Sequence, residues 1–214
     1  MVTILTAYAM KLSEWKEKGD YFTYKGHQLF TIDEGKGEDL LLIHGFPTAS
    51  WDWWQMWDVL AAQYRVLTLD MLGFGFSAKP RDYPYSILDQ ADLIEQLLAS
   101  KDITKVKILS HDYGDTVAQE LLARYNGRQE NGKKRVELES ICFLNGGLFP
   151  ETHSPLLVQK LLMSPVGGLV GRLFTREKLA KNFRKIFGPH TQPTEEEMDA
   201  YWELVSNRGG RYIY

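Results

Sequence analysis

The sequence of 214 residues predicts an α/β fold with a mostly parallel sheet, an N-terminal hairpin and an inserted helical lid. Short apolar runs alternate with helical segments, which is typical of parallel strands covered by helices on both faces. After residue 149 the pattern changes to helical segments broken by prolines. We therefore expect the N-terminal part of a core at 1–149 and a partial lid at 150–214. The remaining core strands are expected to be absent, which leaves the fold C-terminally incomplete.

A hairpin is expected first, because segments 21–24 and 28–32 flank the turn Lys25-Gly26-His27. Four short apolar runs follow, each with the length of a buried strand. They are 40–43, 66–69, 106–109 and 141–144. Helices are predicted between and after them, at 51–63, 87–100 and 115–125. The last two have apolar residues at spacings of three and four, as an amphipathic helix requires.

A polar residue or a turn follows each apolar run, at His44, Asp70, Asp112 and Asn145. In open α/β sheets ligands bind beyond the carboxyl ends of the strands, so all four positions should meet at one rim. We expect His44, Gly45 and Pro47, and likewise Asp70, to brace the loops that follow their strands. Asn145 is a candidate to face the substrate or the lid.

The lid prediction rests on the segments after residue 149. There, Thr194-Glu195-Glu196-Glu197 has the form of a capped helix start. A helical lid excludes water from a site and supplies side chains that face the substrate.

Composition narrows the functional class. With 44% hydrophobic residues and a net charge of -3, the chain can bury one sizeable core and nothing favours a nucleic-acid partner. The single Cys142 lies in an apolar run, so we expect it to be buried and unable to form an intrachain disulfide, which indicates a reducing compartment such as the cytoplasm. Residues 2–10 are too short to span a bilayer and lack a basic flank, so no membrane span or signal peptide is expected. No cofactor or metal is expected.

Asp112 is the candidate nucleophile. A sharp strand-to-helix turn that displays a nucleophile needs small residues two positions before and two after it. Around Asp112 these are Ser110 and Gly114, whereas around Ser110 they would be Ile108 and Asp112. The spacing therefore favours Asp112 over Ser110. The competing interpretation is that Asp112 is an ordinary helix N-cap.

An aspartate nucleophile suits displacement at saturated carbon, because its attack on acyl carbon would only give an anhydride. The leaving group would be a halide or an epoxide oxygen, and the product an ester on the enzyme. Water activated by a general base, normally His, must then hydrolyse that ester. The oxyanion donors would be the N–H groups of Tyr113 and of Phe46, in the loop His44-Gly45-Phe46-Pro47 after the first buried strand.

Three motifs carry a resemblance to a known family: the loop at 44–47, the stretch 70–77 and the elbow at 110–114. Over about residues 20–214 the chain resembles the α/β-hydrolases, in the branch of epoxide hydrolases and haloalkane dehalogenases. The residues at 110–115 and 145–153 look most like those of the mesoderm-specific transcript homologues. The resemblance implies the α/β-hydrolase fold and a small hydrophobic, electrophilic substrate.

The same resemblance separates the two reactions. Dehalogenases of this branch place a halide-binding residue third in the loop and a Trp after the nucleophile, but this chain has Phe46 and Tyr113 there. Epoxide opening is therefore favoured over dehalogenation, which stays the alternative. Epoxide hydrolases use lid tyrosines to protonate the ring oxygen. The candidates are Tyr201, Tyr212 and Tyr214.

The acid and the base of the expected triad are not found. After Asp112 the histidines are His153, which no candidate acid strand precedes, and His190, which lies in a turn at 188–191. Asp70 is better placed as a brace. His111 should point away from the pocket. The sequence thus predicts a fragment with a nucleophile and an oxyanion hole. A competing hypothesis is a catalytically silent hydrolase-fold protein that binds a partner or ligand, with an exposed sheet edge.

Aromatic residues lie on both sides of this site. The tryptophans at 51, 53, 54 and 57 are expected to pack a helix rather than contact substrate. For Phe74 and Phe76 two roles stay open: packing within the loop, or forming part of the pocket wall.

Overall fold

The computed structural model describes residues 10–130, 136–147 and 174–212, and its centre is a six-stranded sheet. The strands are β1 (Asp20–Tyr24), β2 (His27–Gly35), β3 (Asp39–Ile43), β4 (Arg65–Leu69), β5 (Lys105–His111) and β6 (Glu137–Leu144). Their order is β1-β2-β4-β3-β5-β6, and β3, β4, β5 and β6 run parallel. The carboxyl ends of the parallel strands therefore share one edge, as the sequence predicts.

The two strands of the N-terminal hairpin pair antiparallel, and β2 also runs antiparallel to its other neighbour, β4. β1 and β2 are joined by Lys25 and Gly26, both with positive φ (47° and 79°), which is the backbone of a tight two-residue turn. His27 was expected in the turn and belongs to β2 instead, because a two-residue turn leaves it free to pair with Tyr24.

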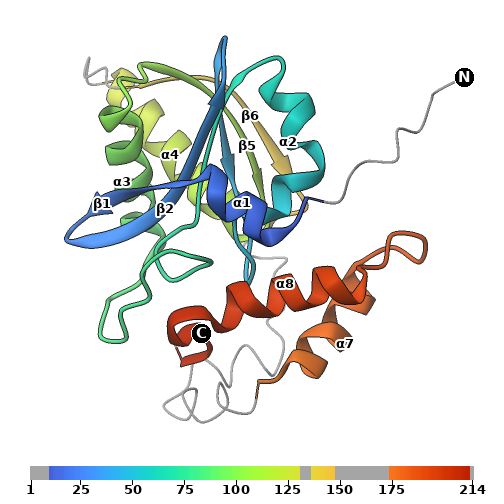
Figure 1. Cartoon of the computed structure of the whole chain (residues 1–214). Helices are drawn as coiled ribbons and strands as arrows, with labels where there is room; N and C mark the ends of the chain where they lie inside the picture. Colours follow the sequence, from blue (N-terminus) through green and yellow to red (C-terminus); the bar gives the residue numbers. More distant parts are fainter. Residues whose placement is uncertain (1–9, 131–135, 148–173, 213–214) are drawn as a thin grey trace, which may run out of the picture.

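Helices cover both faces of the sheet (Figure 1). On one face, α3 (Ile87–Ser100) and α4 (Tyr113–Glu130) pack on a core that includes Leu41, Ile43 and Val106. On the other face lie α1 (Leu12–Lys18), the 3-10 helix η1 (Ser50–Trp53) and α2 (Trp54–Ala61). The helix predicted at 51–63 is thus divided into η1 and α2, and the pattern had not indicated α1.

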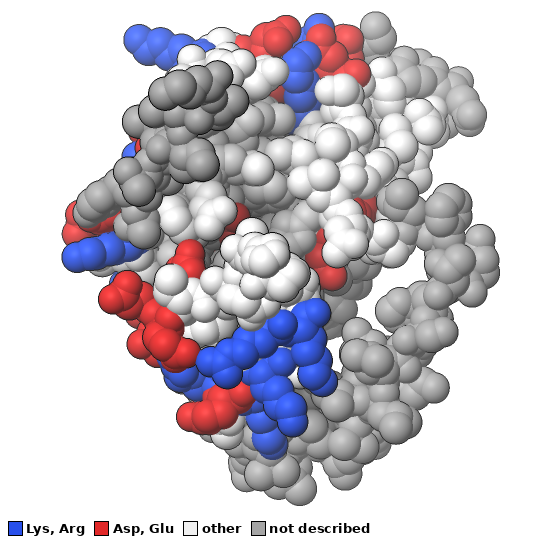
Figure 2. Space-filling view, turned by 90° about the vertical axis from the view of Figure 1, so that its right-hand side faces the viewer, with Lys and Arg blue, Asp and Glu red and all other residues white. Residues whose placement is uncertain are grey.

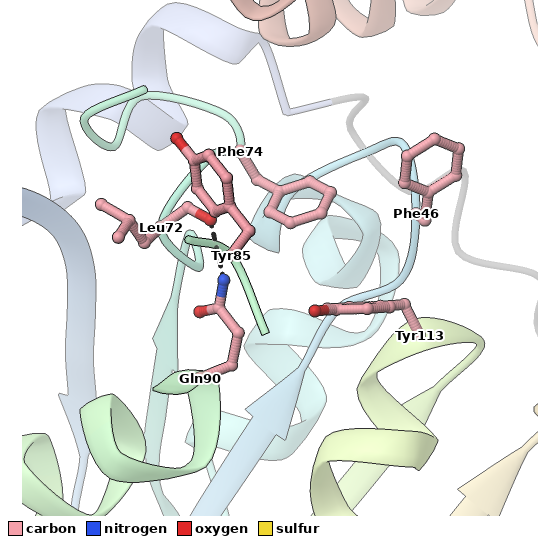
Figure 3. A pocket seen from close by; sticks show the side chains of 7 residues that line it. Phe46, Leu72, Phe74, Tyr85, Gln90 and Tyr113 are labelled. Carbon is pink, nitrogen blue, oxygen red and sulfur yellow. Dashed lines mark hydrogen bonds between the residues drawn. The ribbon is translucent and has the colours of Figure 1, made fainter. Parts of the chain in front are cut away.

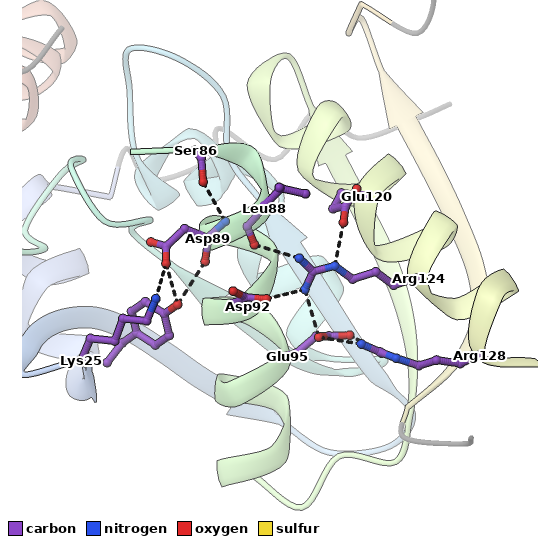
Figure 4. A network of polar contacts seen from close by, with 10 residues as sticks. Lys25, Ser86, Leu88, Asp89, Asp92, Glu95, Glu120, Arg124 and Arg128 are labelled. Atoms are coloured by element: carbon purple, nitrogen blue, oxygen red, sulfur yellow. Dashed lines mark hydrogen bonds and ion pairs between the residues drawn. The ribbon is translucent and has the colours of Figure 1, made fainter. Parts of the chain in front are cut away.

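A polar network fixes α4 against α3 (Figure 4). Arg124 on α4 bonds to Asp92 at 2.7 Å, Glu95 at 3.1 Å and the carbonyl of Leu88 at 3.0 Å. Arg128 adds a second contact to Glu95. These contacts fix the second half of α4, the helix that begins immediately after Asp112.

Residues 174–212 form a helical pair beside the carboxyl ends of the parallel strands (Figure 1). It consists of α7 (Arg176–Ile186) and α8 (Glu195–Ser206), followed by the 3-10 helix η3 (Asn207–Tyr212). The predicted capped start is confirmed, since the Thr194 side chain accepts from the N–H of Glu197 and Glu197 bonds back to Thr194. Apolar residues of both helices join the core that contains Trp51. Basic side chains gather over the outer side of α7 (Figure 2).

The prediction that Cys142 is buried is wrong, because its side chain is exposed. β6 pairs only with β5 at the edge of the described sheet, and its residues alternate between exposed and half-buried. An apolar run at a sheet edge therefore does not imply burial on both faces.

Within the described residues, no helix is both long and apolar enough to cross a membrane. Residues 1–9, which include most of the segment tested above for a leader, lie outside this description.

Candidate active site

Asp112 stands at a sharp turn between β5 and α4. Its φ is 52°, in the left-handed region that a non-glycine residue adopts at a cost. Its N–H bonds to the carbonyl of Leu144 at 3.2 Å, and the N–H of Asp115 bonds to the carbonyl of Asp112 at 3.1 Å. The turn is thus tied to β6 on one side and to its own helix on the other, with the side chain exposed.

Glycines make this turn possible on both sides. A Cβ on Gly114 would lie 2.5 Å from the carbonyl oxygen of Ile43 and 2.6 Å from that of His44. A Cβ on Gly45 would lie 2.7 Å from the Cβ of Asp112. The loop after β3 and the start of α4 therefore approach more closely than any side chain allows.

The two expected donors meet the same oxygen of Asp112. The N–H of Phe46 donates to Oδ1 at 2.8 Å, and the N–H of Tyr113 donates to Oδ1 at 2.6 Å. No donor among the described residues is recorded on Oδ2. One carboxylate oxygen is therefore held by two backbone N–H groups, while the other is free to react. Phe46 is followed by a cis peptide bond to Pro47.

This geometry differs from that of an N-cap. An N-cap side chain accepts from the second or third N–H of its helix and its backbone is extended. Asp112 instead has positive φ and accepts from the first helical residue, Tyr113, and from the distant Phe46. The N-cap interpretation does not account for these contacts.

A second carboxylate lies beneath the turn, and sequence reasoning missed it. Asp115 is fully buried, and its Oδ1 accepts from the Ser110 hydroxyl at 2.6 Å. Gly146 lies directly against this carboxylate, where a Cβ would collide with it. Burial raises the pKa of Asp115. The sequence feature that could have indicated this buried carboxylate is an Asp in the first turn of a helix with small residues at 110 and 146.

His44 and Asp70 lie fully buried in the loops after β3 and β4. The Nδ1 of His44 lies 2.8 Å from the carbonyl of Gly45, and its Nε2 accepts from the N–H of Met71 at 3.0 Å. Only the neutral ring with its proton on Nδ1 satisfies both contacts. Burial lowers the pKa of His44 to about 4, which agrees with that neutral form.

Asp70 accepts three hydrogen bonds. Its Oδ1 receives the N–H of Ser50 at 2.8 Å and the Ser50 hydroxyl at 2.6 Å, and its Oδ2 receives the N–H of Phe76 at 2.7 Å. Burial nevertheless raises its pKa. With no exposed oxygen, Asp70 ties the loop after β4 to η1, as expected of a brace.

His111, the residue before Asp112, pairs with Asp52 of η1. Its Nε2 lies 3.0 Å from Oδ2 of Asp52, which also accepts from the Thr48 hydroxyl. Burial lowers the pKa of His111, but the hydrogen bond and charge of Asp52 outweigh it and raise the pKa overall. The ring of Trp53 lies edge-on at 5.6 Å. Sequence patterns had not indicated this pair.

A cavity of about 160 Å³ lies between the loop after β3 and the start of α4 (Figure 3). Its lining residues are Phe46, Leu72, Gly73, Phe74, Tyr85, Gln90 and Tyr113. Phe74 thus forms pocket wall, whereas Phe76 is buried against Phe30 in the core. Phe46 and Tyr113 thus line the cavity, and their N–H groups also hold Oδ1 of Asp112.

The remaining candidates lie elsewhere. Tyr201 is buried between Trp51 and Phe183, with ring centroids 5.1 and 5.0 Å away, and burial raises its pKa well above the ordinary value. Asn145 is exposed at the end of β6 with a φ of 56°. His190 is exposed in the turn between α7 and α8. His153, Tyr214 and the side chain of Tyr212 lie outside the described residues.

The four tryptophans are buried, in agreement with a packing role. Trp51 stacks on Trp54 with centroids 6.0 Å apart, and the indole N–H of Trp57 donates to Glu34 at 2.6 Å. In the part of the chain that the structure describes, no group of three or more His, Cys, Asp or Glu side chains is arranged to hold a metal ion.

A nucleophile turn between a strand and a helix, facing a loop that supplies a second N–H, is the arrangement of the alpha/beta hydrolase class. The sequence model of that family matches residues 40–160, and the chain belongs to the alpha/beta hydrolase fold family. The mesoderm-specific transcript protein of Mus musculus is 44% identical to this chain over 213 residues, which cover 94% of this chain and 62% of the relative. The chain therefore spans about three fifths of that relative's length.

Solved structures show the same fold. The epoxide hydrolase CorEH superposes with a TM-score of 0.70 at 22% identity, covering 91% of this chain and 70% of that one. The haloalkane dehalogenase DatA from Agrobacterium tumefaciens C58 superposes with a TM-score of 0.68 at 23% identity, covering 92% and 65%. At these identities the likeness concerns the fold. The predicted α/β-hydrolase fold and the resemblance to mesoderm-specific transcript homologues are confirmed.

Proposed function

We propose that Asp112 is a nucleophile that opens epoxides and carries the product as an alkyl ester. The observation that carries the proposal is the pair of N–H groups, from Phe46 and Tyr113, on one oxygen of an exposed carboxylate. Oδ2, which has no donor in the described part of the chain, attacks a ring carbon. The C–O bond of the epoxide breaks, and its oxygen takes a proton from an acid. Oδ1 then becomes the ester carbonyl and already lies in the oxyanion hole.

The lid tyrosines are proposed as the acid that protonates the ring oxygen. Of Tyr201, Tyr212 and Tyr214, only Tyr201 has a described side chain. Burial raises the pKa of Tyr201 well above its ordinary value, so its hydroxyl is protonated at neutral pH, but the ring packs between Trp51 and Phe183 and does not line the cavity beside Phe46 and Tyr113. The helical pair at 174–212 is proposed to act as the lid, since α8 lies across the strand ends that carry the site (Figure 1).

Hydrolysis of the ester requires a base beside Asp112. Among the described histidines, His44 is locked between two backbone groups, and His111 is paired with Asp52. His27 and His190 make no recorded contact with Asp112. We therefore expect this chain to form the ester faster than it releases it.

The experiment is mass spectrometry of the chain after incubation with a panel of terminal, styrene-type and glycidyl epoxides. We expect a stable adduct of one epoxide mass on the peptide that contains Asp112. The Asp112→Asn variant should show none, because an amide does not attack the ring. If no epoxide labelled the wild-type chain while its far-UV circular dichroism showed a folded protein, the nucleophile proposal would be wrong. The silent binding protein would then be the better description.

A further inference from the structure

The pair formed by His111 and Asp52 leaves one ring nitrogen of the histidine unused. Asp52 occupies only Nε2, which lies 3.0 Å from its Oδ2. With Asp52 ionised, the neutral ring carries its proton on Nε2 and keeps a lone pair on Nδ1. In the described part of the chain Nδ1 has no recorded partner, and it is not a fully buried atom. Water can therefore reach the nitrogen that is able to accept a proton.

Asp52 itself is held in place. Its side chain is 10% exposed, and its Oδ2 also accepts from the Thr48 hydroxyl. The ring of Trp53 lies edge-on to His111 at 5.6 Å. A fixed carboxylate that holds the proton on the far ring nitrogen is the arrangement in which a histidine acts as a general base. The contact that occupies Nε2 thus prepares Nδ1 to take a proton.

Gly45 brings His111 and Asp112 together. A Cβ on Gly45 would lie 2.7 Å from the Cβ of Asp112 and 2.9 Å from Nδ1 of His111. Both side chains therefore contact the same side of Gly45. Burial lowers the pKa of His111, but the contact with Asp52 and, after it, the charge of Asp112 raise the pKa overall. An effect of Asp112 on this ring is expected of a carboxylate close to it.

We infer that His111 is the general base that hydrolyses the ester on Asp112, and that Asp52 positions its ring. The inference rests on the proposed function of Asp112. Water attacks Cγ of the ester and gives a proton to Nδ1. The oxyanion forms on Oδ1, which the N–H groups of Phe46 and Tyr113 already hold. The bond between Cγ and Oδ2 then breaks, and the diol leaves with Oδ2 and the proton from Nδ1. The oxygen of the water stays on Asp112, whose new carboxyl group loses its proton to solvent.

Release by this base is expected to be slower than formation of the ester. Because the pKa of His111 is raised, part of the ring population is already protonated at pH 7 and cannot accept a second proton. The adduct should therefore last long enough to be isolated. The competing route for its loss is attack by hydroxide from solvent, which does not need the ring.

The first test follows the loss of the adduct. The 214-residue chain is labelled with each epoxide of the panel, styrene oxide among them, freed of excess reagent and followed by intact mass at pH 8. Far-UV circular dichroism checks that each variant is folded. The wild-type chain should lose the adduct at least about tenfold faster than His111→Gln. His190→Gln is the matched control and should behave as the wild type, because His190 is exposed in the turn between α7 and α8.

The outcomes of this test separate the two proposals. Equal loss from the wild-type chain and from His111→Gln would overturn the base and leave the nucleophile proposal standing. If no epoxide of the panel formed an adduct on any folded variant, the nucleophile proposal would fail, and His111 would have no ester to hydrolyse.

The second test is the pH dependence of adduct loss. The titratable groups around the ring are Asp52 of η1, Asp112 and Asp115 at the start of α4, and His44 after β3. Asp112 is uncharged as an ester, and His44 is neutral above its pKa of about 4. The rate should therefore rise with pH and level off as His111 loses its proton. In Asp52→Asn the rise should move to lower pH and reach a lower plateau. A rise and plateau that survived in His111→Gln would overturn the base.

The third test follows the oxygen atoms. In water enriched in ¹⁸O, the wild-type chain should carry one ¹⁸O atom on the peptide that contains Asp112 after the adduct is lost. His111→Gln should gain this label at least about tenfold more slowly. Loss of the adduct without ¹⁸O on Asp112 would show that the bond between Cγ and Oδ2 is not the one that breaks, and would overturn the inference.

Discussion

Two corners of the same sheet edge each contain one histidine and one aspartate, in opposite environments. At the ends of β3 and β4, His44 and Asp70 are fully buried, and every polar atom of their side chains has a partner. At the end of β5, His111 is about one third exposed and Asp112 is exposed, with one oxygen free of recorded donors. In the first corner all polar side-chain atoms are occupied, whereas in the second a carboxylate oxygen has no donor among the described residues.

The histidines show the same contrast in their protonation. Burial lowers the pKa of His44 to about 4, whereas the contact with Asp52 raises the pKa of His111 despite the burial that opposes it. The residue type and its position at a strand end therefore do not determine a role. What determines it is how many donors and acceptors the surrounding backbone supplies.

Asp70→Asn should give the largest effect, a loss of about 4 kcal/mol in the free energy of unfolding. The new amide N–H₂ must face one of the donors, from Ser50 or Phe76, that now meet the carboxylate. Asp112→Asn is the matched control and should cost less than about 1 kcal/mol, since Asn tolerates positive φ and Oδ2 has no donor to lose. Urea denaturation of both variants tests the contrast. Similar losses in the two would show that the corners do not differ as described.

Acidification should destabilise the chain through His44. The pKa of this ring is about 4 in the folded state against an ordinary 6.5. Between these pH values the ring binds a proton in the unfolded chain but stays neutral in the folded chain. The contribution of His44 is therefore complete above pH 6.5 and is lost as the pH falls towards 4, a difference of roughly 3 kcal/mol. Urea denaturation at pH 7 and pH 4.5 measures it. His44→Gln should be less stable at pH 7 but should have a smaller pH dependence, and an unchanged dependence would contradict the assignment.

Gly114→Ala tests how closely the elbow is packed. A methyl group there would lie 2.5 Å from the carbonyl oxygen of Ile43, so we expect a loss of about 2 to 3 kcal/mol. Gly127→Ala in the same helix is the control, because nothing lies within 4 Å of the added carbon. That variant should gain about 0.5 kcal/mol or more from better helix propensity. Thermal unfolding of the two variants should move in opposite directions, and a stable Gly114→Ala chain would contradict the close approach.

The smallest effect is expected from Asp52→Asn, which removes the charge opposite His111. The pKa of His111 should fall, because the hydrogen bond to and charge of Asp52 are what raise it. Titration of the His111 ring protons by NMR measures the shift. Asp58→Asn, at an exposed position on α2, serves as the control and should leave the titration of His111 unchanged. An unchanged titration in Asp52→Asn would show that the pair does not form in solution.

The strands, the hairpin and the elbow could be predicted from the sequence because each depends on local patterns. Apolar runs set the strands, and small residues at 110 and 114 set the turn around Asp112. The predicted donors Phe46 and Tyr113 were found on one oxygen of Asp112 because their places relative to the elbow follow from chain order in such a fold. Helix Leu12–Lys18 and the exposure of Cys142 were missed, since both depend on what lies opposite them in space.

By itself, the sequence determined that a carboxylate, rather than a hydroxyl, stands at the elbow, and that aromatic residues fill the positions a dehalogenase would use for halide. Only the tertiary structure decided which groups meet across the chain. The contacts of Asp115 with Gly146 and of Asp52 with His111, and the place of Gln90 in the cavity lining, all join segments that are distant in sequence. Periodicity and spacing constrain a residue's own strand or helix, whereas burial and hydrogen bonding depend on the neighbours that packing brings to it.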